Sequence, residues 1–229
     1  MGRNTQRKLV NFGINTIGDL ARTDEKLLVA YLGKMGGILW AFANGYDDSP
    51  VRLEHTHAPI KSVGNSVTTP RNLETDEDVK IILYVLAESV SARLRESGFR
   101  CRVVEISVRD KDLNSFTRQR KIKNATNITK EIAEQTFQLF KENYNWCKAI
   151  RSLGVRGADL VTDNYWEQID LFSSVEMREK QMKMDEAVDE IRKRFGFYSV
   201  QRGLMYQDRK LSAVNAKADH TVHPRGYFA

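Results

Sequence analysis

The sequence has few cysteines and no long hydrophobic run. Cys101 and Cys147 are the only cysteines in 229 residues, too few for a disulfide framework or a cysteine-based metal site. No apolar stretch approaches the roughly 18 residues of a membrane span, and no secretory signal is present. We therefore expect a cytoplasmic, reducing setting, no membrane contact and a monomeric protein.

Catalytic motifs are also missing. The four histidines form two close pairs, but neither pair has cysteine or carboxylate partners at metal-ligand spacing. The acidic runs at residues 47–48 and 76–78 are explained by turn chemistry and by the dipole at a helix start. There is no phosphate-binding loop and no Ser-His-Asp arrangement. We expect no catalytic residue, no metal site and no cofactor in this chain.

Positive charge is in excess, and it is unevenly distributed. The composition is that of an ordinary globular protein, with 41% apolar and 29% charged residues and a net charge of +6. Residues 1–45 carry six Lys and Arg against three acids, residues 59–162 carry eighteen against thirteen, and residues 163–229 carry eleven of each. Between Asp112 and Glu131 there is no acid, but five Lys and Arg. This pattern indicates a polyanion partner such as nucleic acid, with a merely solvated basic face as the alternative.

The first 45 residues are expected to form short helices joined by glycine turns. Gly13 is a helix stop, and a second helix follows Thr16. Three glycines between residues 33 and 37 divide the next apolar stretch into two helices rather than one. Residues 46–59 contain two prolines, several acids and no periodicity, which is typical of a linker.

Residues 60–162 show a clear alternation of strand and helix patterns. The expected strands cover residues 61–69, closed by Pro70, then 102–110 and 115–123, and a last short one at 149–157; the expected helices cover 75–97, capped by Thr75 and stopped by Gly98, and 129–144. The order β-α-β-β-α-β predicts an α+β, ferredoxin-like domain with a mixed or antiparallel four-stranded sheet and two helices on one face. The other face of such a sheet is open to a ligand.

Residues 163–229 are less regular. Apolar residues at 184, 188, 191 and 195 predict one helix that stops at Gly196. The polar sequence beyond it is expected to form a short strand and an extended tail.

A β-α-β-β-α-β module with a basic face first suggests RNA recognition, in which bases stack on aromatic residues of the central strands. We take the strands at 61–69 and 115–123 as the corresponding ones. They supply one aromatic residue, Phe116, and several cations. Cations without a stacking platform suit backbone phosphates, so we expect a binder of the duplex backbone and keep the RNA-binding module as a disfavoured alternative.

Several segments together resemble one family. "GINTIGDLA" followed by "LGKMGGILWAFANGYDDSPV" resembles the thumb, with its helix-hairpin-helix, of Y-family translesion DNA polymerases (the DNA-polymerase-IV and UmuC-like group). "KSVGNSVTTPRNL", "RCRVVEISVRD", "SFTRQRKI" and "IRSLGVRGADL" resemble the little-finger domain of that family in order and spacing. The resemblance covers nearly the whole chain from Gly2.

The resemblance implies a domain organisation for the chain. Residues 1–45 would be a thumb remnant, 60–162 the DNA-binding little finger, and 163–229 a C-terminal tail. The palm and fingers that normally precede the thumb are not in this sequence. We therefore expect the DNA-holding half, inactive alone, of a bacterial DNA-directed DNA polymerase that uses Mg²⁺ and serves DNA damage tolerance in the SOS response. The alternative is a stand-alone regulatory protein that binds DNA or a clamp.

Candidate DNA contacts follow from the matching motifs. The resemblance implies phosphate contacts along the first and last strands, at Lys61, Ser62, Gly64, Asn65, Arg151 and Arg156. Arg118 and Arg120, with Lys121 beside them, share one strand face by the two-residue period and are expected to reach the same groove. Backbone N–H groups near Gly13 and Gly18 are expected to meet phosphates at helix N-termini, with simple helix punctuation as the alternative.

Residues Gln168, Leu171 and Phe172 resemble the sliding-clamp-binding peptide that follows the little finger in bacterial members of the family. In an extended segment the two apolar side chains enter a hydrophobic pocket, and the glutamine hydrogen-bonds its rim. The expected partners are thus primer-template DNA and the bacterial sliding clamp. The alternative is that Leu171 and Phe172 pack on the C-terminal helix.

Overall fold

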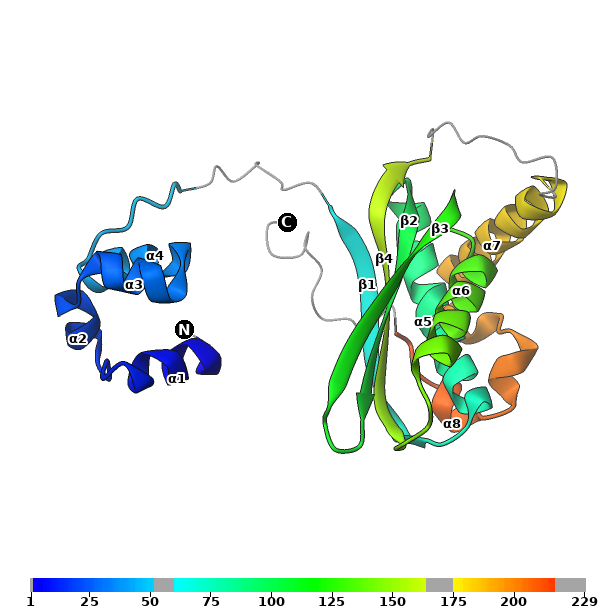
Figure 1. The fold of residues 1–229 in the computed structure, drawn as a ribbon. Helices are drawn as coiled ribbons and strands as arrows, with labels where there is room; N and C mark the ends of the chain where they lie inside the picture. The colour runs from blue at the N-terminus through cyan, green and yellow to red at the C-terminus, as the bar shows by residue number, and fades with distance from the viewer. Residues whose placement is uncertain (1, 52–59, 164–174, 217–229) are drawn as a thin grey trace. The chain divides into compact units, whose positions relative to one another are not determined.

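The chain forms two compact units. A computed structural model describes residues 2–51, 60–163 and 175–216. The two units are residues 1–56 and residues 57–229. Figure 1 shows the helices and strands of each. No helix in the described ranges is long and apolar enough to cross a membrane.

The N-terminal unit consists of short helices around a small core. They are α1 (Arg3–Asn11), α2 (Ile17–Arg22), α3 (Glu25–Leu32) and α4 (Lys34–Ala43). The expected break within residues 24–45 is confirmed, because Gly33 has a φ of 67° between α3 and α4. The buried apolar core of the unit is Leu9, Ile14, Leu20 and Leu28.

The second unit has the element order that the sequence predicts. It contains β1 (Ser62–Leu73), α5 (Asp76–Glu96), β2 (Phe99–Asp110), β3 (Ser115–Thr126), α6 (Thr129–Asn143) and β4 (Ile150–Thr162). The expected start of α5 is confirmed, since the hydroxyl of Thr75 accepts a hydrogen bond from the N–H of Asp78 at 3.2 Å. So is its expected end, because Gly98 follows with a φ of 67°.

The strand order differs from what the element order alone suggests. The sheet runs β1-β4-β2-β3 and every neighbouring pair is antiparallel. The α+β class is confirmed, but β1 and β3 lie at the edges, so the assignment of residues 61–69 and 115–123 to central strands is wrong. β4 lies against β2 without a side chain at Gly157, where a Cβ would lie only 3.0 Å from the Cβ of Cys101 on β2.

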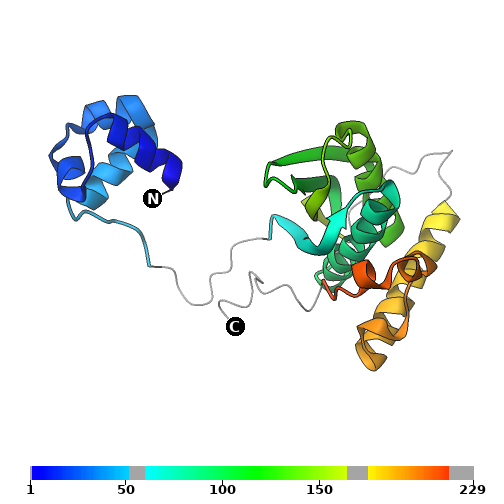
Figure 2. The same ribbon diagram turned by 90° about the horizontal axis from the view of Figure 1, so that it is seen from below.

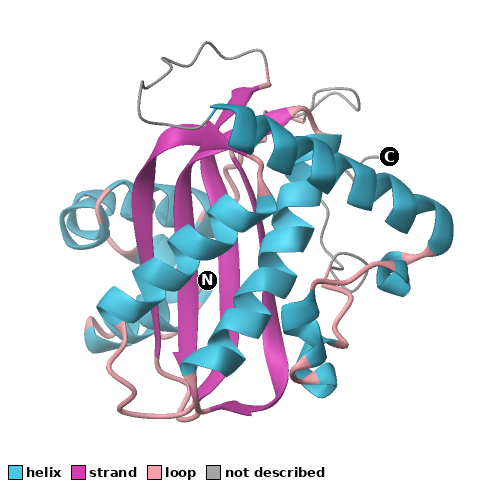
Figure 3. Ribbon diagram, turned by 90° about the vertical axis from the view of Figure 1, so that its right-hand side faces the viewer, coloured by secondary structure: helices cyan, strands magenta, loops and turns pink. Residues whose placement is uncertain are grey.

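All four strands are longer than expected, β1 and β4 most notably at their C-terminal ends. β1 continues through Pro70 to Leu73, because the ladder to β4 is irregular between Thr68 and Leu73 and no pairing hydrogen bond is demanded of the proline. β4 spans thirteen residues rather than a short segment. Helices α5 and α6 cover one face of this sheet (Figures 2 and 3). The core between the layers includes Val104, Ile106, Val108, Leu153 and Val155 from the central strands.

The C-terminal residues that the structure describes form helices, and the expected strand is not among them. Helix α7 (Val175–Phe195) ends before Gly196, as expected. Two 3-10 helices at Phe197–Ser199 and Gly203–Tyr206 and the short α8 (Arg209–Ser212) follow, and no strand lies between residues 197 and 216. This segment joins the core through Met205, Leu211 and Ala216. Its apolar residues are too widely spaced for a period to show in the sequence.

A candidate nucleic-acid interface

Strand register assigns each residue to one face of the sheet. Residues directly opposite each other in an antiparallel pair project on the same side. Glu105 on β2 lies opposite Gln119 on β3 and opposite Arg156 on β4, which in turn lies opposite Gly64 on β1. Since the neighbours of Glu105 in β2 are buried under the helices, this row faces away from α5 and α6. We call that side the open face.

The open face is built almost entirely of small and polar residues. By register it comprises Ser62, Gly64, Ser66 and Thr68 of β1; Ser152, Gly154, Arg156 and Ala158 of β4; Val103, Glu105, Ser107 and Arg109 of β2; and Ser115, Thr117, Gln119 and Lys121 of β3. A Cβ on Gly154 would lie 2.3 Å from the Ser107 hydroxyl and 3.0 Å from the Ser66 Cβ. There is thus no room for a side chain at residue 154, and the surface around it is shallow and lined with hydroxyl groups.

Positive charge lies at both ends of the open face and at its centre. At one end of the open face, Ser62 of β1 and Lys121 of β3 stand in the same cross-strand row, and Lys61 directly precedes Ser62 in the chain. Arg109 lies near the opposite end. In the middle, Arg156 has 53% of its side chain exposed, and its Nη1 lies 3.4 Å from Oε1 of Glu105, the single acid on the face. Cations therefore outnumber acids along the whole surface.

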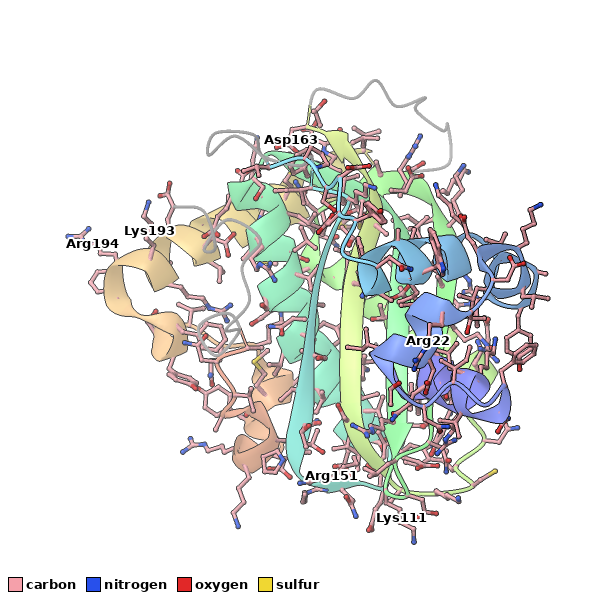
Figure 4. All side chains as sticks on the ribbon, turned by 90° about the vertical axis from the view of Figure 1, so that its left-hand side faces the viewer. Arg22, Lys111, Arg151, Asp163, Lys193 and Arg194 are labelled. Carbon is pink, nitrogen blue, oxygen red and sulfur yellow. The ribbon has the colours of Figure 1, made fainter. Side chains whose placement is uncertain are left out.

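Arg151 and Lys111 extend this basic surface at one end of the sheet, and Asp163 lies at the other (Figure 4). The guanidinium of Arg151 donates to the carbonyl of Thr69 at 2.6 Å, and the N–H of Lys111 donates to the carbonyl of Ala149 at 2.9 Å. The first contact joins Arg151 to the backbone of β1, and the second joins Lys111 to the residue before β4. Both side chains remain at the surface. Lys111 was not among the residues expected to bind DNA.

The hairpin beside this basic end is held together by hydrogen bonds to Asp110. The carboxylate of Asp110 accepts hydrogen bonds from the side chain of Asn114 at 3.0 Å and from two backbone N–H groups of the turn. These bonds, the side chain of Asn114 first, lower the pKa of the Asp110 carboxyl. The acid next to Lys111 is thereby engaged within the turn. Sequence reasoning also missed Arg109, although the inward alternation of Val104, Ile106 and Val108 places it outward.

Arg118 and Arg120 lie on the opposite side from the open face. They share a face, as the two-residue period predicts, but they pair with the buried Ile106 and Val104 of β2. Their side chains turn to α6: Arg118 donates to Asn143 at 3.2 Å, and Arg120 forms an ion pair with Glu142. The period decides which residues share a face but not which face it is. Lys121, one residue on, is the member of this group that reaches the open face.

Asn65 also departs from the expectation. Its side chain is 7% exposed and donates to the hydroxyl of Ser89 at 3.1 Å and to the carbonyl of Ala216. The side chain thus lies under the helices and fastens the C-terminal segment to β1. A DNA contact by this side chain does not fit its placement.

In the N-terminal unit, the N–H groups of Gly13, Thr16 and Asp19 are engaged internally. The N–H of Gly13 donates to the carbonyl of Val10 at 2.9 Å. Thr16 and Asp19 form a capping box at the start of α2, where the Asp19 carboxylate accepts from the N–H of Thr16 at 3.0 Å. Hydrogen bonding by Thr16 lowers the pKa of Asp19, so a negative charge already occupies this turn beside Gly18. Helix punctuation is the better account of Gly13, whereas Gly18 lies inside α2 and a phosphate contact near it stays a prediction.

The remaining predicted residues cannot be placed. Gln168, Leu171 and Phe172 lie outside the described residues. Within the described ranges, no group of three or more His, Cys, Asp or Glu side chains is arranged to hold a metal ion.

Comparison with known proteins identifies the family. The impB/mucB/samB family C-terminal domain matches residues 60–171. DNA polymerase IV of Acetivibrio thermocellus is 48% identical over 93% of this chain and 54% of its own length. DNA polymerase IV of Clostridium kluyveri is 33% identical over 92% of the chain and 54% of its own length.

The fold agrees with these sequence matches. A Y-family DNA polymerase chimera of Dbh and Dpo4 superposes with a TM-score of 0.54 over 71% of this chain and 46% of its own, at 18% identity. This likeness concerns the fold alone. The chain spans about half the length of the curated relatives it matches. It belongs to the Y-family DNA polymerases, and it corresponds to the C-terminal part of these proteins.

Proposed function

We propose that this chain is the DNA-holding and clamp-recruiting part of a translesion DNA polymerase, and that its open face lies along the phosphate backbone of primer-template DNA. The observation that carries the proposal is the composition of that face. It is low, rich in hydroxyls and glycine, and bears Arg109, Lys121 and Arg156 against one acid.

This composition suits backbone contacts rather than base recognition. Serine and threonine hydroxyls donate to phosphate oxygens, and small side chains let the DNA approach the sheet closely. Single-stranded RNA readers instead stack bases on aromatic side chains of the sheet. The open face contains no aromatic residue, and Phe116 projects to the helix side, opposite Val108. The RNA-binding alternative is thus further disfavoured.

Catalysis is proposed to belong to another part of the polymerase. Phosphoryl transfer by such enzymes uses Mg²⁺ ions held by clustered carboxylates. The described residues do not offer such a cluster, so Mg²⁺ does not fit this part of the chain and no catalytic step is assigned to it. Its contribution would be to hold the duplex.

Binding to primer-template DNA should be strongly salt-dependent and insensitive to sequence. If about six phosphates are neutralised, log K falls against log[salt] with a slope near −5. Arg109→Ala and Arg156→Ala should each weaken binding about three- to tenfold for all sequences and make the slope about one unit shallower. Fluorescence anisotropy with labelled duplexes of several sequences measures both effects.

Arg120→Ala is the matched control, because Arg120 has the same chemistry but faces α6. It should leave the affinity and the slope unchanged. A flat salt dependence would rule out the backbone platform, whereas equal losses in Arg120→Ala and Arg156→Ala would show that the wrong face was assigned.

The clamp contact is proposed from the sequence of the segment after β4. Burying Leu171 and Phe172 in a pocket is worth roughly 3–6 kcal/mol before ordering costs are subtracted. These two side chains alone thus give a weak tether, with a Kd between several millimolar and roughly tens of micromolar. Such a tether is sufficient where the polymerase and the clamp hold the same DNA, because linkage raises the effective concentration.

A Leu171→Ala/Phe172→Ala double variant should lose binding to a purified bacterial sliding clamp, measured by surface plasmon resonance. Its melting temperature should match that of the parent chain, because the proposed role is in docking. Glu167→Ala is the control and should bind as the parent does. A lower melting temperature with clamp binding retained would instead mean that the two apolar side chains pack on the protein itself.

A further inference from the structure

Helix α7 docks on its domain through charged side chains. Its single buried residue is Asp185, which is 3% exposed. The Asp185 carboxylate accepts hydrogen bonds from the N–H of Thr129 at 2.7 Å and from the guanidinium of Arg202 at 2.8 Å, and Arg95 lies 3.4 Å away. An acid therefore occupies the place where a surface helix usually buries an apolar residue.

The same polar contacts continue one heptad on either side. Arg178 donates to Glu131 at 2.7 Å, and Arg192 forms an ion pair with Glu88 at 2.8 Å. Residues 178, 185 and 192 are seven apart, so they lie on one face of the helix. This face is turned toward α5 and α6, and α7 lies on the side of those helices away from the sheet (Figure 1).

Four apolar residues of α7 lie at the surface, while Met182 and Val188 are half-buried. Met177, Met184, Ile191 and Phe195 are 57%, 48%, 39% and 66% exposed. With Gln181 and Val188 they occupy positions 177, 181, 184, 188, 191 and 195, where steps of four and three alternate. This is the spacing of a coiled-coil seam. We call these six residues the α7 seam.

The surroundings of the α7 seam are basic. Residues three or four positions away are surface neighbours on a helix. Within α7, the charged neighbours of the four exposed apolar side chains are Lys180, Arg192 and Arg194, and none of the six acids of the helix is among them. Lys180 and Arg194 are exposed and form no ion pair with any residue that the structure describes, and the Arg194 guanidinium lies 5.1 Å from the Phe195 ring centre.

We propose that the α7 seam binds an amphipathic helix of another protein, one whose apolar seam is flanked by acidic residues. The alternation of three and four residues matches a helical partner, because a helix presents its apolar side chains at that interval. Unbranched methionines adapt to a partner surface, and the basic flanks complement acidic ones. The inward ion pairs hold the helix so that the four exposed apolar side chains of the α7 seam stay at the surface, with Gln181 and Val188 half-buried beside them.

A designed peptide tests the proposal on the full chain. The probe is a 21-residue peptide, helical on its own, with leucines at the alternating spacing and glutamates at the flanks; a second peptide carries lysines at those flanks. Anisotropy should show micromolar binding of the acidic peptide and at least tenfold weaker binding of the basic one. Ile191→Asp should weaken the acidic peptide at least tenfold. Lys180→Glu/Arg194→Glu should reverse the preference between the two peptides.

Lys183→Glu/Lys193→Glu is the matched control, because it makes the same charge change away from the α7 seam. It should keep the parent's preference. Equal binding of both peptides, or an equal effect of the control, would overturn the proposal. Two further results would also overturn it: binding of phosphatidylglycerol vesicles in place of the peptides, and self-association in sedimentation that Ile191→Asp abolishes. These would assign the seam to lipid or to a second copy.

Discussion

Replacing Gly36 by alanine is expected to unfold the N-terminal unit, whereas the same change at Gly37 is expected to leave it folded. A Cβ on Gly36 would lie 2.0 Å from the carbonyl oxygen of Leu28 and 2.8 Å from the N–H nitrogen of Val29. These are backbone atoms of α3, so they cannot turn aside as a side chain would. The two helices would have to separate, which opens the small core around Leu28.

The loss of stability in Gly36→Ala should exceed the free energy of unfolding of the N-terminal unit. Overpacking a core typically costs about 1–3 kcal/mol, and a clash with backbone exceeds that range. A unit of this size has a stability of only a few kcal/mol. Hydrogen exchange read by mass spectrometry should therefore show loss of protection across α1–α4 in Gly36→Ala, with protection in the β-sheet unchanged.

Gly37→Ala isolates the steric cause, because Gly37 is the next residue in the same helix. Its nearest neighbours would be the side chains of Glu25 and Val29 at 3.4 Å, an ordinary contact distance. Alanine also favours a helix over glycine by up to about 1 kcal/mol. Equal protection of the two variants would show that α3 and α4 do not approach each other as closely as described.

Replacing Asp185 by alanine should cost the second unit about 3–5 kcal/mol, because it removes the buried acid that Arg95 and Arg202 share and leaves each with one acidic partner, Asp189 or Glu88. Arg95 is 9% exposed and Arg202 is 26% exposed, so neither can regain full hydration in place. The N–H of Thr129 at the start of α6 also loses its acceptor. Urea unfolding followed by circular dichroism measures the loss, and hydrogen exchange should show α7 released first.

Asp189→Ala is the matched control. Its carboxylate also accepts from Arg95, at 2.7 Å, but its side chain is 26% exposed and Arg95 keeps its bond to the carbonyl of Asn127. The expected cost is about 1–2 kcal/mol. If both variants lost the same free energy of unfolding, the burial of the acid would not determine the loss. The buried-charge argument would then fail.

Local sequence signals determined the elements of this protein. Thr75 and Gly98 mark the two ends of α5, and Gly33 separates α3 from α4, because caps and left-handed turns depend on a few neighbouring residues. The alternation in β2 likewise determined which of its residues share a face. The family resemblance also needed only the order of such segments.

Tertiary structure decided which face and which neighbour each element received. Arg118 and Arg120 face α6 because β3 pairs with β2 in a register set by buried Val104 and Ile106. Asn65 is covered because residues about 150 positions later return to β1. In α7, three of the four apolar residues whose spacing predicted the helix are exposed, and the buried residue is Asp185. Such outcomes depend on pairings between distant parts of the chain, which leave no periodic mark in the local sequence.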